Sequence, residues 1–125
     1  MRRLLVFVFA FVTLVGCSSG SQSLSPTDFQ KLTSESGVIT LDVRTPAEFA
    51  AGHLSNAVNV DVESPDFATQ IGQLDPKASY AVYCRSGNRS KVAMEQMSAA
   101  GFTTTHDLDG GIVAWQAAGL PVTTG

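Results

Sequence analysis

The sequence predicts an α/β fold in which a parallel β-sheet is covered by helices. Short, largely apolar, β-rich runs lie at residues 38–43, 57–60, 80–84 and 103–108. Helical patterns separate these runs, and such alternation is typical of parallel strands joined by helical crossovers. The chain has 125 residues, of which 44% are hydrophobic, so its length suits one domain with a packed core.

Three segments carry the pattern of a helix start. In 25–28 and 45–48, a serine or threonine that can cap the helix stands before a proline suited to the first helical position. An acidic residue follows in the first turn of each segment. Segment 64–66 is a third, weaker instance of the same pattern. We therefore expect a helix to begin at each of these segments, and the helices to alternate with the predicted strands.

Two more helices are predicted after the last two apolar runs. Segment 88–100 has small and apolar side chains at spacings of three and four residues, and segment 111–118 carries Ile112 and Trp115 on one face. Gly119 and Pro121 end the second of these helices. The inward-facing stripe of the first is expected to consist of Val92, Ala93, Gln96, Met97 and Ala100.

The N-terminus has the pattern of an export signal. Two arginines precede an uncharged apolar run at residues 4–15, which is too short for a membrane-spanning helix of about 20 residues but fits a signal peptide. The run ends in Leu14-Val15-Gly16-Cys17, which resembles a bacterial lipobox. We therefore expect a lipoprotein signal peptide at 1–16, a lipid on Cys17 and a flexible tether at 17–23. The mature protein would be exported and membrane-anchored, facing the periplasm or the cell exterior.

Lipid on Cys17 would leave Cys84 as the one thiol of the mature chain, with no disulfide. Removal of Arg2 and Arg3 leaves six basic residues against eleven acidic ones, a net charge of −5. This acidity argues against nucleic acid as a partner, because phosphate binding needs a broad basic face. Three of those six basic residues nevertheless lie within seven residues of Cys84.

Cys84 occupies the predicted turn between a strand and a helix, in the sequence Cys84-Arg85-Ser86-Gly87-Asn88-Arg89-Ser90. Parallel α/β sheets place binding sites at the carboxyl ends of strands, and a helix N-terminus favours negative charge. Gly87 would let the turn curl so that successive N–H groups point at the sulfur. The pattern therefore predicts a nucleophilic thiolate at Cys84, with an anionic substrate held beside it.

Four blocks of the sequence resemble single-domain rhodaneses, the thiosulfate sulfurtransferases. The resemblance covers roughly residues 24–124 and includes the Cys84 turn just quoted. The other blocks are residues 41–49, residues 52–60, and Gly110-Gly111-Ile112-Val113-Ala114-Trp115 with Gly119-Leu120-Pro121-Val122. It implies a rhodanese-like domain at 24–124 with about five mostly parallel strands and helices on both faces of the sheet.

The resemblance also implies a reaction. Cys84 would take the outer sulfur of thiosulfate or another sulfane donor, hold it as a persulfide, and pass it to cyanide or a thiol. Loop amides would stabilise the persulfide, and Arg85 or Arg89 would hold the sulfonate, so the substrate-binding residues would be Arg85, Ser86, Gly87, Asn88 and Arg89. No cofactor and no metal are implied, and no Cys/His cluster has a metal-ligand spacing.

Alternative functions remain open at this point. The same fold can serve as a binding or persulfide-carrier module without turnover of small molecules. A cysteine phosphatase or arsenate reductase is a lesser alternative, because four residues separate Cys84 from Arg89 where cysteine phosphatases have five.

Three polar side chains outside the turn call for separate expectations. Asp42 ends a predicted strand and is a candidate residue of the active-site mouth. Arg44 and Glu48 lie four residues apart and are expected to form a structural ion pair.

Overall fold

The computed structural model describes residues 22–125, and their strands form one sheet in which every pair of neighbouring strands is parallel. The strand order is β1-β5-β4-β2-β3. This confirms the predicted α/β class with five parallel strands. Along the chain the elements are β1 (Gln22–Leu24), α1 (Pro26–Thr33), β2 (Val38–Asp42), α2 (Pro46–Ala51), β3 (Val58–Asn59), α3 (Phe67–Ile71), β4 (Ser79–Tyr83), α4 (Asn88–Ala99), β5 (Thr104–Leu108) and α5 (Gly111–Ala117).

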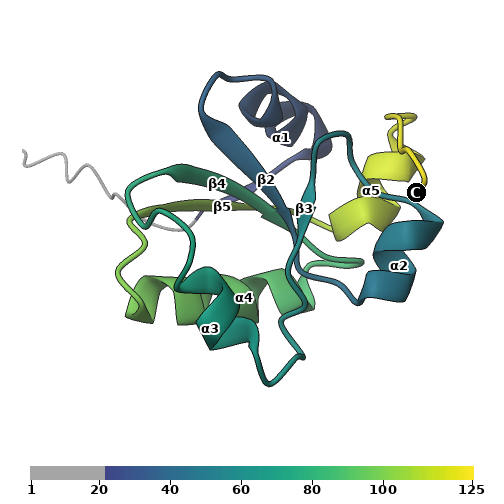
Figure 1. Cartoon of the computed structure of the whole chain (residues 1–125). Helices are drawn as coiled ribbons and strands as arrows, with labels where there is room; N and C mark the ends of the chain where they lie inside the picture. The colour runs from purple at the N-terminus through teal and green to yellow at the C-terminus, as the bar shows by residue number, and fades with distance from the viewer. Residues whose placement is uncertain (1–21) are drawn as a thin grey trace, which may run out of the picture.

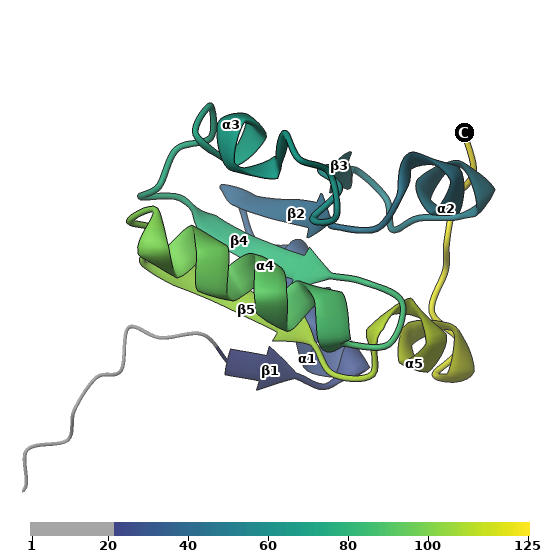
Figure 2. The ribbon, with the colours of Figure 1, turned by 90° about the horizontal axis from the view of Figure 1, so that it is seen from below.

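Parallel pairing brings the carboxyl ends of the strands to one edge of the sheet. β4 is central, and in its register Val82 lies opposite Leu41 of β2 and Asp107 of β5. Figure 2 shows the arrowheads of the strands pointing toward the same edge, where α2 and α5 lie. The loop after β4 therefore emerges between these two helices.

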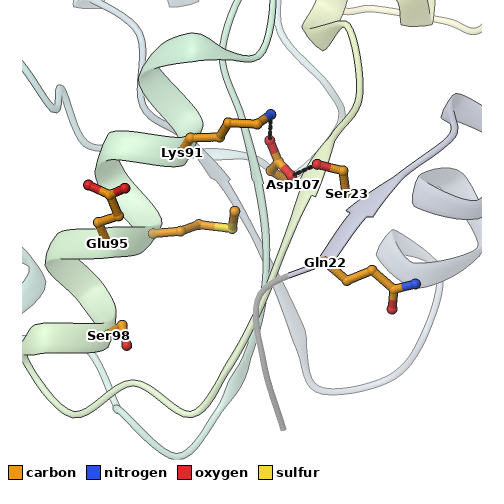
Figure 3. A pocket seen from close by; sticks show the side chains of 7 residues that line it. Gln22, Ser23, Lys91, Glu95, Ser98 and Asp107 are labelled. Carbon is orange, nitrogen blue, oxygen red and sulfur yellow. Dashed lines mark hydrogen bonds and ion pairs between the residues drawn. The ribbon is translucent and has the colours of Figure 1, made fainter. Parts of the chain in front are cut away.

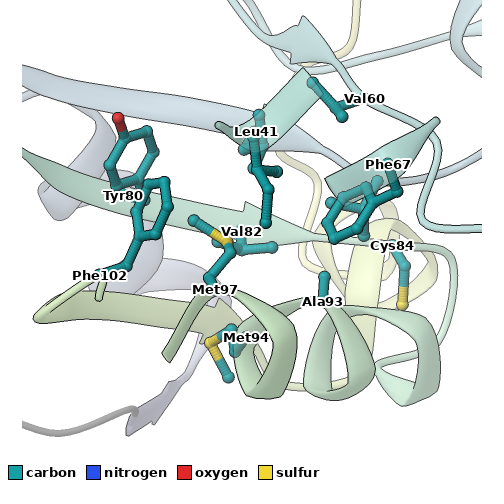
Figure 4. Packing of buried hydrophobic residues seen from close by; sticks show 12 residues of the cluster. Leu41, Val60, Phe67, Tyr80, Val82, Cys84, Ala93, Met94, Met97 and Phe102 are labelled. Atoms are coloured by element: carbon teal, nitrogen blue, oxygen red, sulfur yellow. The ribbon is translucent and has the colours of Figure 1, made fainter. Parts of the chain in front are cut away.

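Helices cover both faces of the sheet, as expected. α1 lies on the side opposite α3 and α4 (Figure 1). Alternation along β4 sends Tyr80, Val82 and Cys84 into one hydrophobic cluster with α3 and α4, and Ala81 and Tyr83 into the other, which includes side chains from α1 and α5. Figure 4 shows the first cluster, with Cys84 at its end. The site is thus built where the core meets the carboxyl edge of the sheet.

The predicted caps are confirmed for the first two helices. Ser25 accepts a hydrogen bond from the amide of Asp28, and Thr45 forms a reciprocal capping box with Glu48. The third start is less direct, because α3 begins at Phe67, after a turn in which Ser64 Oγ accepts from the amide of Asp66.

Two details differ from the sequence prediction. Gln22 and Ser23, which were assigned to the tether, belong to β1, because their backbone groups pair with β5. Their polar side chains gave no sequence pattern of a strand. The inward stripe of α4 is also shifted. Ala93 and Met97 are buried as expected, together with Met94, whereas Val92 is 48% exposed.

No helix within residues 22–125 is long and apolar enough to cross a membrane. The predicted signal peptide at 1–16 and Cys17 lie outside the described residues.

Candidate functional site

Cys84 directly follows the last residue of β4 and lies at the carboxyl edge of the sheet. Its residue surface is 1% exposed, and its neighbours in the hydrophobic cluster include Phe67 and Ala93. In Figure 4 the Cys84 sulfur lies at the end of α4 nearest to the loop. The sulfur therefore meets apolar side chains on one side and the first turn of a helix on the other.

The chain turns sharply between Cys84 and the start of α4. Gly87 has a φ of 105°, a left-handed conformation that glycine adopts at little cost, and α4 begins at the next residue. Because of this turn, the amide of Gly87 points back and donates to Cys84 Sγ across 3.1 Å. The expected cradle of amides therefore faces the sulfur.

The first turn of α5 holds the loop in this conformation. The amide of Ile112 donates to the carbonyl of Cys84 at 2.9 Å, and the amide of Val113 donates to the carbonyl of Arg85 at 3.2 Å. Gly111 makes this approach possible, since a Cβ built there would lie 2.3 Å from the carbonyl oxygen of Arg85. Two carbonyls of the loop are thus drawn toward α5, which leaves the following amides free to face the sulfur.

These contacts favour a thiolate. Burial alone would raise the pKa of Cys84, but hydrogen bonds from the Ser90 hydroxyl and from the amides of Ser90, Gly87 and Ser86 lower it further than burial raises it. The pKa of Cys84 consequently lies below its ordinary value, and the site stabilises negative charge on sulfur.

The side chain of Arg89 is paired with a carboxylate and is not free to bind an anionic ligand. Its guanidinium makes two hydrogen bonds to Glu48 of α2, at 2.6 and 2.9 Å. This bidentate pairing lowers the pKa of Glu48 to about 2. The expected Arg44–Glu48 pair is wrong, because Arg44 pairs with Asp42 instead. The Glu48 carboxylate completes the capping box with Thr45 and pairs with Arg89 of α4.

Arg85 is the exposed cation of the loop. It borders a hollow of about 330 Å³ between α2 and α5, together with Glu48 and Val113. Of the other expected binding residues, Ser86 and Asn88 are exposed on the loop, and Gly87 is buried beneath it. Of the two arginines of the loop, Arg85 is therefore the one that is exposed, whereas Arg89 is paired with Glu48.

Asp42 does not border the mouth of the site. Its residue surface is 0% exposed, and its carboxylate accepts hydrogen bonds from Arg44 Nη2 at 2.7 Å and from Tyr83 Oη at 2.6 Å. Strand β2 ends under α2, so the side chain points into the protein instead of into solvent. Asp42 is a structural partner of Arg44, whose guanidinium also caps the carbonyl of Gly52 at 2.6 Å.

Sequence reasoning missed Ser90 and Asp107 as functional candidates. Both residues are fully buried, and Ser90 Oγ lies within hydrogen-bond distance of Asp107 and close to the sulfur of Cys84. The signal available in the sequence was a lone aspartate inside the β-rich segment 103–108, a position where a buried charge needs partners.

Among the residues that the structure describes, no group of three or more His, Cys, Asp or Glu side chains is placed to hold a metal ion. His53 stacks on Phe49 with ring centroids 3.7 Å apart, and its Nδ1 lies 2.8 Å from the Phe49 carbonyl. The backbone of His53 also pairs with that of Thr123, so His53 has a structural place between α2 and the C-terminal segment.

Comparison with known proteins agrees with this architecture. The model of the family described as "Rhodanese-like domain" matches residues 25–118. A solved structure of a rhodanese-related protein from Thermoplasma volcanium superposes with a TM-score of 0.73 at 31% identity, covering 83% of this chain and 99% of that one.

Two curated relatives carry sulfurtransferase names. Thiosulfate sulfurtransferase 16 of Arabidopsis thaliana is 42% identical over 94 residues, 65% of this chain and 76% of that protein. A sulfurtransferase of Allochromatium vinosum is 33% identical over 102 residues, 82% of this chain and 90% of that protein. The chain spans only 54% of the length of two other curated relatives, from Synechocystis sp. and Raphanus sativus.

Proposed function

Since this chain belongs to the rhodanese-like domain family, we propose that it is a sulfurtransferase that carries a sulfane sulfur on Cys84. The observation that supports this most is the Cys84 sulfur itself. It is almost fully buried, yet it receives an amide hydrogen bond from Gly87 and further donors from the first turn of α4. Such a site favours a sulfur anion in a place where bulk water does not compete for it.

The proposed reaction has two displacement steps. In the first, the Cys84 thiolate attacks the outer sulfur of thiosulfate or a related donor, and the S–S bond of the donor breaks. Its electron pair leaves with sulfite, and Cys84 becomes a persulfide whose outer sulfur carries the negative charge. The loop amides, of which that of Gly87 donates to Cys84 Sγ, would stabilise this second anion as well.

In the second step a thiophilic acceptor, cyanide or a thiol, attacks the outer sulfur of the persulfide. The bond between the two sulfurs breaks, and Cys84 leaves as a thiolate, which is the form that the site stabilises. Both steps are displacements at a sulfur atom, so neither needs a base to remove a proton from Cys84 once the thiolate exists.

Arg85 is the residue proposed to bind the anionic end of the donor. It is exposed beside the hollow between α2 and α5, whereas the charge of Arg89 is matched by Glu48. Pairing with Glu48 also argues against the phosphatase alternative, because the arginine of the loop is already occupied by a carboxylate.

Mass spectrometry after incubation with thiosulfate tests the proposal. We expect a gain of one sulfur atom on the tryptic peptide that contains Cys84, and its removal by cyanide with formation of thiocyanate. Cys84→Ser should abolish the adduct, while Cys17→Ser, the matched substitution at the other cysteine, should leave it unchanged.

The same experiment separates the alternatives. A folded protein that takes up no sulfur would refute the transferase and favour a binding module. A persulfide that forms but is not consumed by cyanide or small thiols would favour a carrier that passes sulfur to another protein. Hydrolysis of an aryl phosphate faster than sulfur transfer would favour the phosphatase.

We further propose that Cys17 carries a lipid that anchors the protein on the outer side of a membrane. This rests on the signal pattern of residues 1–16 and on Gly16 before the cysteine. Membrane fractionation of cells that express the full chain tests it. The wild type should sediment with membranes and Cys17→Ser should not; equal distribution of the two proteins would contradict the anchor.

A further inference from the structure

Behind the Cys84 loop, four polar side chains connect the sulfur to the edge of the sheet. Ser90 Oγ lies 3.6 Å from Cys84 Sγ and 3.0 Å from Asp107 Oδ2. Lys91 donates to the same carboxylate oxygen at 3.3 Å, and Ser23 donates to Asp107 Oδ1 at 2.5 Å. Figure 3 shows Lys91 and Ser23 meeting the carboxylate from α4 and β1.

The geometry offers the Ser90 hydroxyl more acceptors than it has protons. Its oxygen lies near the sulfur of Cys84, the carbonyl of Gly87 at 3.1 Å and the carboxylate of Asp107. A hydroxyl carries one proton, so it can donate fully to only one of them. Hydrogen bonds to charged acceptors are the stronger ones, and the competition is therefore between the Asp107 carboxylate and a Cys84 thiolate.

We propose that Asp107 is a positioning residue: it competes with the Cys84 sulfur for the single hydroxyl proton of Ser90, and so limits how strongly that hydroxyl stabilises the thiolate. When Cys84 is a thiol, its S–H donates to Ser90 Oγ and the Ser90 proton points to Asp107. When Cys84 is a thiolate, the hydroxyl can rotate to the sulfur, and Asp107 keeps its bonds to Lys91 and Ser23.

The other donors at the sulfur do not have this freedom. The amide of Gly87 belongs to a backbone that α5 holds through the carbonyls of Cys84 and Arg85, whereas the Ser90 hydroxyl turns about one bond. Burial increases the energetic effect of this competition for the Ser90 proton. Both Ser90 and Asp107 are fully buried, and a polar group left without a hydrogen bond there is costly.

Several charged groups lie near Cys84 and Asp107 and influence the pH dependence of Cys84. Arg89 of α4 interacts electrostatically with Cys84, and Lys91 of α4 lies against Asp107 with its side chain 56% exposed. Asp107, Lys91 and Glu95 border a pocket of about 510 Å³ between β1 and α4 (Figure 3). The test must therefore separate a contribution relayed by Ser90 from a direct effect of charge.

The consequence for turnover rests on the proposed function. A thiolate that is stabilised too strongly is a weaker nucleophile. Competition from Asp107 would keep Cys84 reactive toward the sulfur donor. In the persulfide, where the inner sulfur is uncharged, the Ser90 proton would return to Asp107 and no buried donor would lose its partner.

The experiment measures the pH dependence of alkylation of Cys84 by iodoacetamide in the full chain, on the tryptic peptide 78–85, which excludes Cys17. The midpoint of this pH curve reports the ionisation of Cys84. Asp107→Asn should move the midpoint to lower pH and, at pH values below the midpoint, raise the alkylation rate about threefold to tenfold, which is the effect expected from one hydrogen bond gained by the thiolate. Ser90→Ala should move the midpoint to higher pH. Asp109→Asn, the same substitution at an exposed position, should leave it unchanged.

The double variant distinguishes the relay from a simple charge effect. In the Ser90→Ala background, the shift caused by Asp107→Asn should shrink to less than half, since the hydroxyl that transmits it is gone. An equal shift in both backgrounds, or a shift to higher pH in Asp107→Asn, would overturn the proposal.

Ser23→Ala serves as a second variant if Asp107→Asn does not fold. It removes one donor from Asp107 without changing any charge, so the carboxylate should draw the Ser90 proton more strongly and move the midpoint to higher pH. That shift should vanish in the Ser90→Ala background; no shift, or one that persists there, overturns the proposal. Sulfur uptake measured in parallel tests the proposed function separately, because Cys84 can titrate as expected and still take no sulfur.

Discussion

The amide of Ile112 donates to the carbonyl oxygen of Cys84 across 2.9 Å, and this contact joins the N-terminus of α5 to the loop that cradles the sulfur. The close approach depends on Gly111, where a side chain would overlap the backbone of Arg85 and Ser86. The geometry of the cradle is therefore decided in part by a segment that lies more than twenty residues further along the chain.

Gly111→Ala should disorganise this cradle. Its φ of 62° adds the cost of a left-handed conformation to the overlap with Arg85. We expect sulfur uptake by Cys84 to slow at least about tenfold, the effect of a barrier raised by about 1.4 kcal/mol. Gly119→Ala is the matched control, since its φ is 76° but a Cβ there meets nothing within 4 Å. It should lose about 1 kcal/mol of stability and keep normal uptake; equal losses in both variants would refute the role of Gly111.

Arg85→Gln should weaken binding of an anionic donor. Loss of a charge-assisted contact of about 1 to 1.4 kcal/mol predicts a fivefold to tenfold rise in KM for thiosulfate, and this difference from the wild type should fade at high salt. Steady-state kinetics at two ionic strengths measure it. A larger KM effect from Arg89→Gln than from Arg85→Gln would show that Arg89 leaves Glu48 to bind the substrate.

The Glu48–Arg89 pair should make stability depend on pH in the acid range. The pKa of Glu48 is about 2 in the folded protein against an ordinary value of 4.5. A carboxyl whose pKa falls on folding stabilises the folded state fully above 4.5, and this contribution is lost as pH drops toward 2. Urea unfolding between pH 6 and about 2 should therefore show a loss that is smaller in Glu48→Gln than in the wild type. Glu95→Gln, at an exposed site on α4, should follow the wild type; if Glu48→Gln did so as well, the pairing would be refuted.

Asp42→Asn should destabilise the fold instead of impairing the chemistry. It leaves Arg44, which is 5% exposed, without its carboxylate partner, and it weakens the acceptor of Tyr83 Oη. Breaking a buried pair in this way costs about 3–5 kcal/mol of unfolding free energy, measurable by urea denaturation. Asp109→Asn, the same substitution at an exposed position, is the control. Unchanged stability together with lost sulfur uptake would restore Asp42 to the mouth of the site.

Local sequence patterns predicted much of the fold. The Ser25-Pro26 and Thr45-Pro46 starts, the four β-rich runs and the helix after Cys84 all correspond to elements of the structure, because caps, periodicity and turn residues act over a few positions. β1 had no such pattern. It is a strand because β5 offers it hydrogen-bond partners more than eighty residues away in sequence.

Side-chain partners were harder to assign than elements. Arg44 and Glu48 lie four residues apart, yet each pairs elsewhere, Arg44 with Asp42 and Glu48 with Arg89. Arg44 precedes the N-cap Thr45 and is therefore not on α2, and its partner Asp42 is only two residues away along the chain. The partner of Glu48 becomes available only when α2 and α4 meet at the edge of the sheet. Helical spacing therefore failed for this pair, because Arg44 lies outside the helix and both side chains form bidentate contacts with other groups.

The order of residues along the chain is enough to place a lone thiol of the folded domain between a strand and a helix, in a turn containing glycine and arginine, because these are local features. The surroundings of that thiol depend on packing between distant segments: the α5 amides that hold the loop, the carboxylate that pairs with Arg89, and Asp107 behind Ser90. These partners lie on other elements, and hydrogen bonds form between atoms that folding brings within about 3 Å, whatever their separation along the chain.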